Sequence, residues 1–167
     1  MNRVTALVAT FVMIALPVWA GEKAVPQFDG RDWKIGWSDY KNGTVFEEYV
    51  VDSEKVENWS ELVTVQFYPG LQKLTNADIF EAGNKSDLSR VCPDIHWEST
   101  SQTDTERIWG WYIQGCSGQP EQSEIVRLVR TDEGFHVFHY AIKKAPMPDD
   151  KKTEWSGRLK SIAIAKS

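Results

Sequence analysis

The chain has 167 residues, with 19 Lys and Arg against 24 Asp and Glu, so its formal net charge is −5. Hydrophobic residues make up 41% and charged residues 26%, as in an ordinary globular protein. This composition excludes a disordered chain, a collagen-like chain and a polytopic membrane protein. The acidic balance also disfavours nucleic-acid binding, which needs a basic surface to neutralise phosphates.

The first twenty residues have the pattern of a secretory signal peptide. Arg3 supplies positive charge, residues 6–16 form an apolar run, and Pro17 precedes a cleavage site of the small-x-small type at Val18-Trp19-Ala20. The apolar run is short for a bilayer span, which needs about 20 residues, so cleavage before Gly21 is preferred to an uncleaved anchor. The sequence therefore predicts a periplasmic or secreted protein with no membrane span after cleavage.

The remaining residues, 21–167, have the length of a single domain. Cys92 and Cys116 are the only cysteines, and an even number in an exported chain predicts a disulfide between them. Closing a loop of about 25 residues stabilises the fold by about 3–4 kcal/mol on chain-entropy arguments. The alternative, a redox or metal-binding pair, is disfavoured because the two cysteines lack CxxC spacing.

Segments rich in β-branched, aromatic and alternating apolar residues predict six strands. They lie at about residues 44–51, 59–68, 96–100, 107–114, 124–130 and 135–143. The segment 21–42 carries several aromatic residues, which indicates packing on the body of the domain. Most strands follow one another in hairpin order, so the sheet is expected to be largely antiparallel.

Two helices are predicted. One runs from about Asn76 to Arg90, after a sequence that resembles a capping box. The other begins where Asp149 or Asp150 can act as the cap, and it carries an apolar stripe of Trp155, Leu159 and Ile162. The predicted fold is α+β, with a single, largely antiparallel sheet of about six strands and both helices packed on one face.

Several motifs occur together along the chain. They are E-N-W-S-E-L-V-T at 57–64, Cys92-Pro93, Trp109, Cys116, Q-S-E-I-V-R at 122–127, Lys143 and Trp155. In combination they resemble a group of small exported bacterial proteins of unknown function, over most of residues 21–167. The order of strand, helix, sheet and helix also resembles the PsbP-like fold. Neither resemblance implies an activity, because fold does not carry function.

Two charged residues are expected to be buried, because each lies on the apolar face of its strand. Glu47 lies on the apolar face of its strand, and Arg127 lies on the apolar face of another. A buried charge needs a partner, so Arg127 is the natural partner of Glu47. A structural ion pair is the preferred interpretation, and a pair that orients a ligand is the alternative. Other carboxylates that could form a glycosidase pair are interpreted as a solvated face; they are Glu48, Glu57, Glu61, Asp149 and Asp150.

Four tryptophans are candidates for a binding surface, because aromatic side chains bind sugars and proteins as well as filling cores. Core packing is preferred for Trp109, whereas Trp33, Trp37 and Trp97 are the better interface candidates.

Signatures of metal binding and catalysis are weak. His136 and His139 are three apart in a predicted strand and therefore face opposite sides, so they and His96 predict no metal site. The fragment Gly115-Cys116-Ser117-Gly118 could supply a nucleophile only if Cys116 were free. The sequence lacks the Gly-x-Ser-x-Gly elbow and the glycine-rich phosphate loops, and no catalytic residue or cofactor is predicted.

These observations favour a non-catalytic binding module that recognises a protein or another envelope component through exposed aromatic and acidic side chains. One form is an inhibitor-like or immunity-like protein that occupies a basic site on an envelope protein. The alternative is a small periplasmic enzyme with a carboxylate–arginine site around Glu47 and Arg127, with Trp109 lining a cleft. A third hypothesis is a structural role without a small ligand.

Overall fold

The computed structural model describes residues 22–25 and 28–166, so the predicted signal peptide and its cleavage site lie outside the described residues. The strands in this part of the chain are β1 (Glu22–Val25), β2 (Trp33–Lys41), β3 (Thr44–Val51), β4 (Glu61–Pro69), β5 (His96–Gln102), β6 (Glu106–Ile113), β7 (Gln122–Arg130), β8 (Gly134–Ile142) and β9 (Ala163–Lys166). The helices are α1 (Ala77–Val91), α2 (Asp149–Ser161) and the short 3₁₀ helix η1 (Leu71–Lys73). No described helix is long and apolar enough to cross a bilayer.

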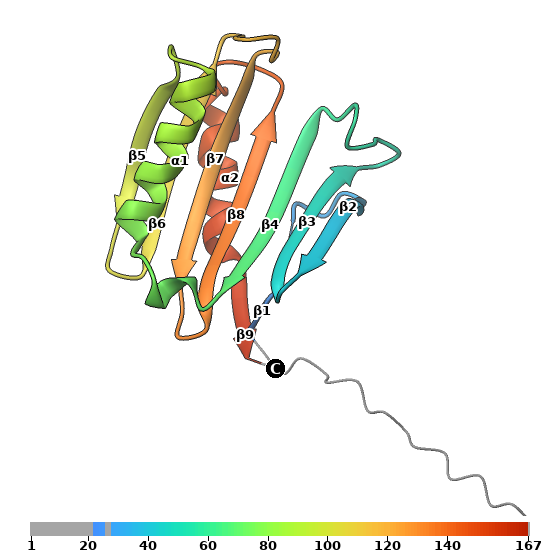
Figure 1. Ribbon diagram of the computed structural model, residues 1–167. Helices are drawn as coiled ribbons and strands as arrows, with labels where there is room; N and C mark the ends of the chain where they lie inside the picture. The colour runs from blue at the N-terminus through green and yellow to red at the C-terminus, as the bar shows by residue number, and fades with distance from the viewer. Residues whose placement is uncertain (1–21, 26–27, 167) are drawn as a thin grey trace, which may run out of the picture.

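Seven strands form one antiparallel sheet in the order β2-β3-β4-β8-β7-β6-β5 (Figure 1). β1 and β9 form a separate two-stranded pair. The predicted α+β class and the antiparallel sheet are confirmed. The sheet has seven strands rather than about six because β2 lies in the segment 21–42, where no strand was predicted.

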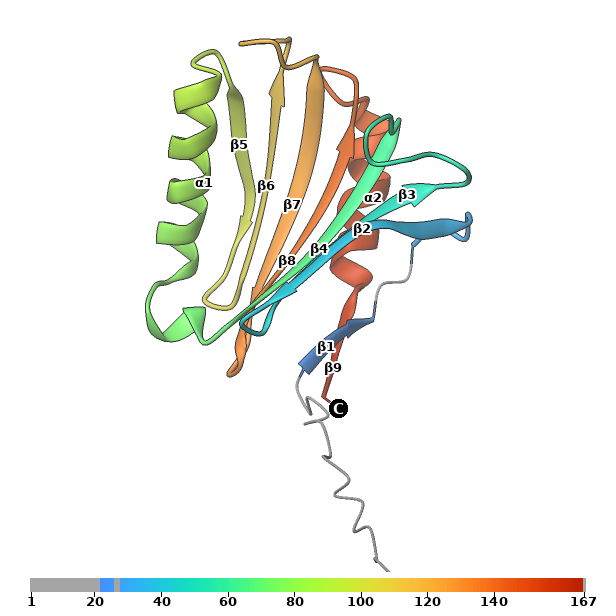
Figure 2. The same cartoon turned by 45° about the vertical axis from the view of Figure 1, so that its right-hand side comes forward.

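The two helices pack on opposite faces of the sheet (Figures 1 and 2), so the prediction that both cover one face is wrong. The physical reason lies in β8, whose residues are apolar on both faces. Phe135 and Val137 belong to the cluster that includes residues of α1, whereas Phe138 and Tyr140 belong to the cluster of α2. A sheet that is apolar on both sides buries both only when each side is covered.

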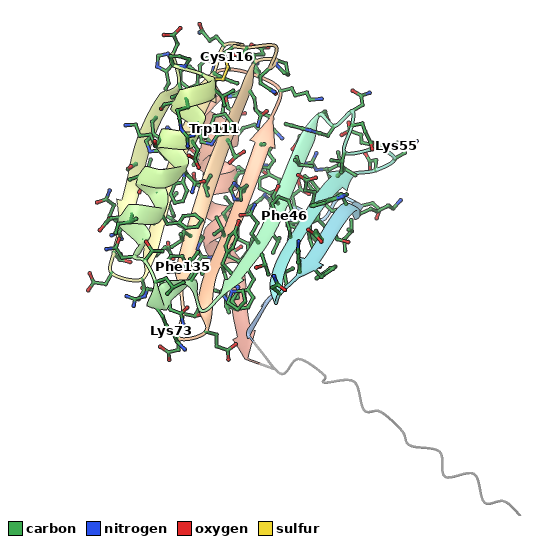
Figure 3. All side chains as sticks on the ribbon, in the orientation of Figure 1. Phe46, Lys55, Lys73, Trp111, Cys116 and Phe135 are labelled. Carbon is green, nitrogen blue, oxygen red and sulfur yellow. A yellow bond between two sulfur atoms is a disulfide. The ribbon has the colours of Figure 1, made fainter. Side chains whose placement is uncertain are left out.

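Helix α1 begins where its sequence predicts. The side chain of Asn76 accepts a hydrogen bond of 2.9 Å from the backbone N–H of Ile79, which caps the helix. Phe80 and Leu88 pack against the sheet. The Cys92–Cys116 disulfide is present as predicted and ties the end of α1 to the loop after β6, with a Cα–Cα distance of 5.5 Å (Figure 3).

Helix α2 presents the predicted stripe to the other face. Trp155, Leu159 and the following Ile162 are 0%, 1% and 3% exposed. Trp155 stacks on Tyr140 of β8, with ring centroids 3.7 Å apart and planes inclined by 6°. Pro148 is the N-cap residue, so the two aspartates predicted as caps lie in the first turn instead.

The predicted packing segment 21–42 contains the whole of β2, which joins β3 through Asn42 and Gly43. Both residues have positive φ, 54° and 79°. Asn-Gly is the sequence that most favours such a two-residue turn, because both positions tolerate this backbone. The result is a hairpin at the edge of the sheet, with only the first residue of β2, Trp33, partly buried.

Candidate functional site

The β2–β3 hairpin (residues 33–51) lies at the edge of the sheet, and its residues 35–48 belong to neither of the clusters that the helices form with the sheet (Figure 2). Only the base of the hairpin, at Trp33 and Tyr49, packs against the cluster of α2. β2 pairs only with β3, and its other edge has no strand partner in the described part of the chain. Ile35, Trp37 and Tyr40 on β2 are 52%, 46% and 60% exposed. An exposed edge strand with large apolar side chains is a surface that other chains can bind.

The exposed apolar residues lie on both faces of the hairpin. Trp37 pairs with Glu48 and packs edge-on against Phe46, with ring centroids 5.2 Å apart. Tyr40 pairs with Val45 and therefore lies on the opposite face. A partner that covers this apolar surface must contact both faces, as a cleft would.

The negative charge of the chain is concentrated around this hairpin. Residues 32–61, which include β2, β3 and the loop before β4, contain eight acidic and three basic residues, a formal charge of −5. The rest of the chain carries 16 acidic and 16 basic residues and is balanced. Arg31 and Lys151, which lie outside this range, pair with Glu61, and the seven other acidic residues still outnumber the three basic ones. The field around the hairpin is therefore negative and favours approach of a basic surface.

Glu47 is hydrogen-bonded within the hairpin. Its carboxylate accepts hydrogen bonds from the phenols of Tyr40 and Tyr49, the latter at 2.6 Å. Burial and the bond to Glu47 raise the pKa of Tyr49, and the bond to Glu47 and burial raise that of Tyr40. Both phenols therefore stay protonated near neutral pH and remain donors to the carboxylate.

The predicted pairing of Glu47 with Arg127 is wrong, although the two side chains do share a face. Glu47 lies opposite Val65, which lies opposite Phe138, which lies opposite Arg127, so β4 and β8 separate the pair. Three strand spacings place their backbones about 14 Å apart. The carboxylate–arginine site of the enzyme alternative is therefore not formed.

Arg127 instead holds the end of helix α2. Its guanidinium forms an ion pair of 2.9 Å with Glu106 and donates hydrogen bonds of 2.7 and 2.8 Å to the carbonyls of Leu159 and Ile162. A cation at the C-terminal end of a helix binds carbonyls that have no partner within the helix. The role of Arg127 in this geometry is structural.

The other candidate tryptophans are more buried than Trp37. Trp109 is 1% exposed, in agreement with the preference for core packing. Trp97 stacks on Trp109 at 6.0 Å and donates a hydrogen bond of 3.1 Å to Glu81. Trp33 packs edge-on against Trp155 at 5.7 Å. Of the four, only Trp37 is largely exposed to solvent.

The three histidines lie apart on the sheet. His136 and His139 face opposite sides of β8, as their spacing predicts. His136 stacks on Phe67 at 4.5 Å, and His96 stacks on Tyr112 at 4.2 Å. His139 Nδ1 lies 2.7 Å from Glu124 Oε1. Among the residues described, no three His, Cys, Asp or Glu side chains gather as a metal site would need.

Glu61 is the centre of a second charged cluster, so its assignment to a solvated face is wrong. Its carboxylate accepts two hydrogen bonds from Arg31, at 2.9 and 2.7 Å, one of 2.5 Å from Tyr140 and weaker contacts from Lys151. Burial alone would raise the pKa of Glu61, but the bonds from Arg31 and Tyr140 outweigh it and hold the pKa at about 2. Asp29 accepts from Arg31 at 2.6 Å, and its pKa is also lowered, against the effect of burial, to about 2. Through these contacts, residues 29–31 are linked to the sheet at Glu61 and Tyr140 and to α2 at Lys151.

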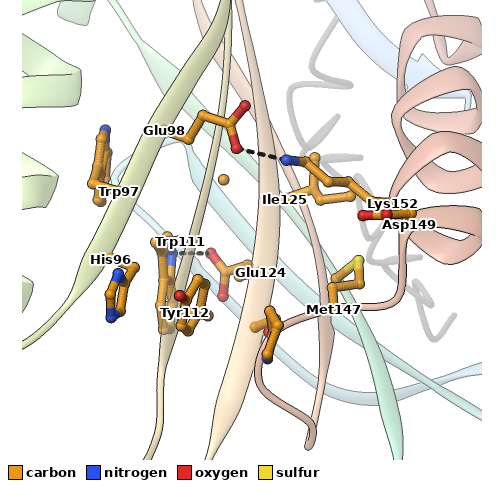
Figure 4. Close-up of a pocket in the computed structure, with 13 residues that line it drawn as sticks. His96, Trp97, Glu98, Trp111, Tyr112, Glu124, Ile125, Met147, Asp149 and Lys152 are labelled. Atoms are coloured by element: carbon orange, nitrogen blue, oxygen red, sulfur yellow. Dashed lines mark hydrogen bonds and ion pairs between the residues drawn. The ribbon is translucent and has the colours of Figure 1, made fainter.

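A groove of about 330 Å³ lies on the face of the sheet that carries α2, beside the first turn of that helix (Figure 4). α2 packs over β7 and β8, and Ile108 of β6 is buried in the same cluster, whereas Gly110 and Tyr112 further along β6 line the groove. Met147 is also among the residues that line it. Lys152 of α2 forms an ion pair of 2.6 Å with Glu98 of β5 across the groove.

A protein-family model matches residues 23–166 of the chain. The chain belongs to this family. No protein of curated function matches the sequence. Among solved structures, the chain is similar to the Ran-binding protein Mog1p of Saccharomyces cerevisiae, at 14% identity and a TM-score of 0.45, over 83% of this chain and 84% of that one. The expected PsbP-like fold is not confirmed.

Proposed function

We propose that this family member is a non-catalytic binding module of the bacterial envelope or exterior, and that it binds a protein partner through the β2–β3 hairpin. The observation that carries this proposal is the exposure of Trp37 and Tyr40 on opposite faces of an edge hairpin. Aromatic side chains that can be fully desolvated are the residues that dominate the energy of protein interfaces.

The charge and the exposed apolar side chains of the hairpin indicate what kind of surface its partner has. Residues 32–61 carry a formal charge of −5, so the complementary surface is basic. Apolar side chains on both faces fit a cleft into which the hairpin inserts. An inhibitor-like or immunity-like protein that occupies a basic cleft of its target would have these features.

An exported location is part of the proposal. The leader-like residues 1–20 and the Cys92–Cys116 disulfide both support it, because structural disulfides persist in oxidising compartments.

The test is capture of the partner from an envelope extract of the source bacterium by three forms of the oxidised chain. The first is wild type, and the second is Trp37→Ser/Tyr40→Ser. The third is the matched control Leu74→Ser/Ile79→Ser, which removes apolar side chains that are 84% and 61% exposed elsewhere on the molecule. All three should fold, because the substituted side chains are exposed.

We expect one stoichiometric partner with wild type and with the control, and a loss of at least about 30-fold in affinity with the hairpin variant, as for an interface aromatic worth about 2 kcal/mol. The complex should weaken as salt is raised, because an acidic and a basic surface attract each other less at high ionic strength. Equal capture by the hairpin variant and the wild type would contradict the proposal.

A further inference from the structure

We infer that the groove beside α2 is a binding site for a neutral saccharide of one or two rings. This site is separate from the hairpin and does not depend on the proposed function. The groove lies on β5, β6 and β7, on the other side of β8 and β4 from the hairpin (Figures 1 and 4).

The size of the groove suits a small ligand. Its volume of about 330 Å³ lies at the lower end of the range of small-molecule sites, about 300–1,000 Å³. The space exists because position 110 is glycine. A Cβ atom at Gly110 would meet only the carbonyl oxygen of Glu124, at 3.4 Å, so the absent side chain is not required by a close backbone approach. A larger residue at Gly110 would project into the groove.

One wall of the groove is an aromatic platform. His96 stacks on one face of Tyr112, with ring planes inclined by 9°, and leaves the other face toward the groove (Figure 4). The stacking fixes the orientation of the Tyr112 ring. The C–H face of a pyranose packs on an aromatic face of this kind through dispersion and weak C–H contacts. Met147 and Ile125 add apolar surface to the groove.

The charged groups suit a neutral ligand with many hydroxyls. The carboxylates of Glu98, Glu124 and Asp149 disfavour an anion. Two of them already have partners, since Glu98 pairs with Lys152 and Glu124 is hydrogen-bonded to Trp111 and lies beside His139. The Glu98–Lys152 pair is 63% and 37% exposed at its two side chains, so water still reaches both charged groups. A carboxylate accepts several hydrogen bonds and an ammonium donates three, whereas a hydroxyl can do either. Vicinal hydroxyls can therefore bind to both members of the pair at once without burying an unpaired charge.

The test is an NMR titration of the ¹⁵N-labelled, oxidised chain with maltose, cellobiose and N,N′-diacetylchitobiose. At least one sugar should give saturable shifts at the amides of Gly110, Tyr112 and Lys152, with millimolar affinity. Tyr112→Ala should weaken that binding by up to about tenfold, the effect of losing one aromatic contact. Gly110→Val should abolish it while the rest of the spectrum stays dispersed, and the matched control Gly83→Ala on α1 should bind as wild type does.

Three results would overturn the inference. One is the absence of saturable shifts with all three sugars, and another is binding by Gly110→Val as strong as that of wild type. The third is saturable shifts with inorganic phosphate or with tetramethylammonium but not with the sugars, which would assign the groove to a charged ligand. Trp37→Ser/Tyr40→Ser should leave the sugar titration unchanged, so failure of the hairpin proposal and failure of this one are distinguishable.

Discussion

Replacing Glu61 by Gln is expected to remove much of the acid sensitivity of the fold. The pKa of Glu61 is about 2 in the folded protein and 4.5 in its ordinary state. The side chain of Glu61 is 17% exposed, so screening by solvent is limited. A pKa that is lower in the folded state stabilises the fold fully above about pH 5, and this stabilisation is lost as the pH falls toward 2.

The magnitude follows from the shift. At 1.36 kcal/mol per pKa unit, the ionised carboxylate contributes up to about 3 kcal/mol at pH 7, and about 2 kcal/mol of this is lost by pH 3. Glu61→Gln also removes an acceptor for Arg31, so the variant is expected to be less stable than wild type at pH 7 by about 3 kcal/mol. The difference between the two proteins should narrow by about 2 kcal/mol at pH 3. Asp29 shares Arg31, so its contribution does not simply add.

The assay is urea denaturation of wild type, Glu61→Gln and the control Glu57→Gln at pH 7 and pH 3. Glu57 lies on the exposed loop before β4, and its substitution should change the free energy of unfolding by less than about 0.5 kcal/mol at either pH. A difference between wild type and Glu61→Gln that is the same at both pH values would refute the assignment of acid sensitivity to this carboxylate.

Three further variants test the packing, each by chemical denaturation. Replacing Cys92 and Cys116 by Ser should lower the free energy of unfolding by about 3–4 kcal/mol, and addition of a reductant to wild type should have a similar effect. Arg127→Met should destabilise the fold by about 3–5 kcal/mol, because Glu106 and two carbonyls at the end of α2 lose their partner, while leaving capture by the hairpin intact. Trp155→Ala should cost about 3–5 kcal/mol, since this ring is 0% exposed. Losses below about 1 kcal/mol would contradict the assigned role in each case.

Local signals in the sequence predicted most elements of the fold. The stripe of Trp155, Leu159 and Ile162 identified α2, because a spacing of four and three places residues on one helical face. The edge hairpin was missed although its turn, Asn42-Gly43, is a strong signal. The exposed aromatic residues of β2 were instead interpreted as packing residues, because large apolar side chains are usually buried.

The pairing of Glu47 with Arg127 was predicted wrongly because it depends on the order of strands in the sheet. Alternation correctly placed Glu47 and Arg127 on one face, but it contains no information about how many strands lie between them. β8 pairs with β4, far back in the sequence, and this pairing separates the two residues. The position of the second helix could have been inferred, because Phe135 and Phe138 lie on opposite faces of one strand and each face needs cover. The Glu61–Arg31 contact joins residues 30 apart and has no local signal.

Photo-crosslinking in living cells would show directly whether the β2–β3 hairpin is a docking surface. A photoreactive phenylalanine analogue would be placed at position 40 in one strain and, as a control with the same exposure, at position 79 in another; Tyr40 is 60% exposed and Ile79 is 61% exposed. We expect a discrete crosslinked species of higher mass from position 40 and none from position 79. No crosslink from position 40, or the same species from both positions, would contradict the assignment of the hairpin as the docking surface.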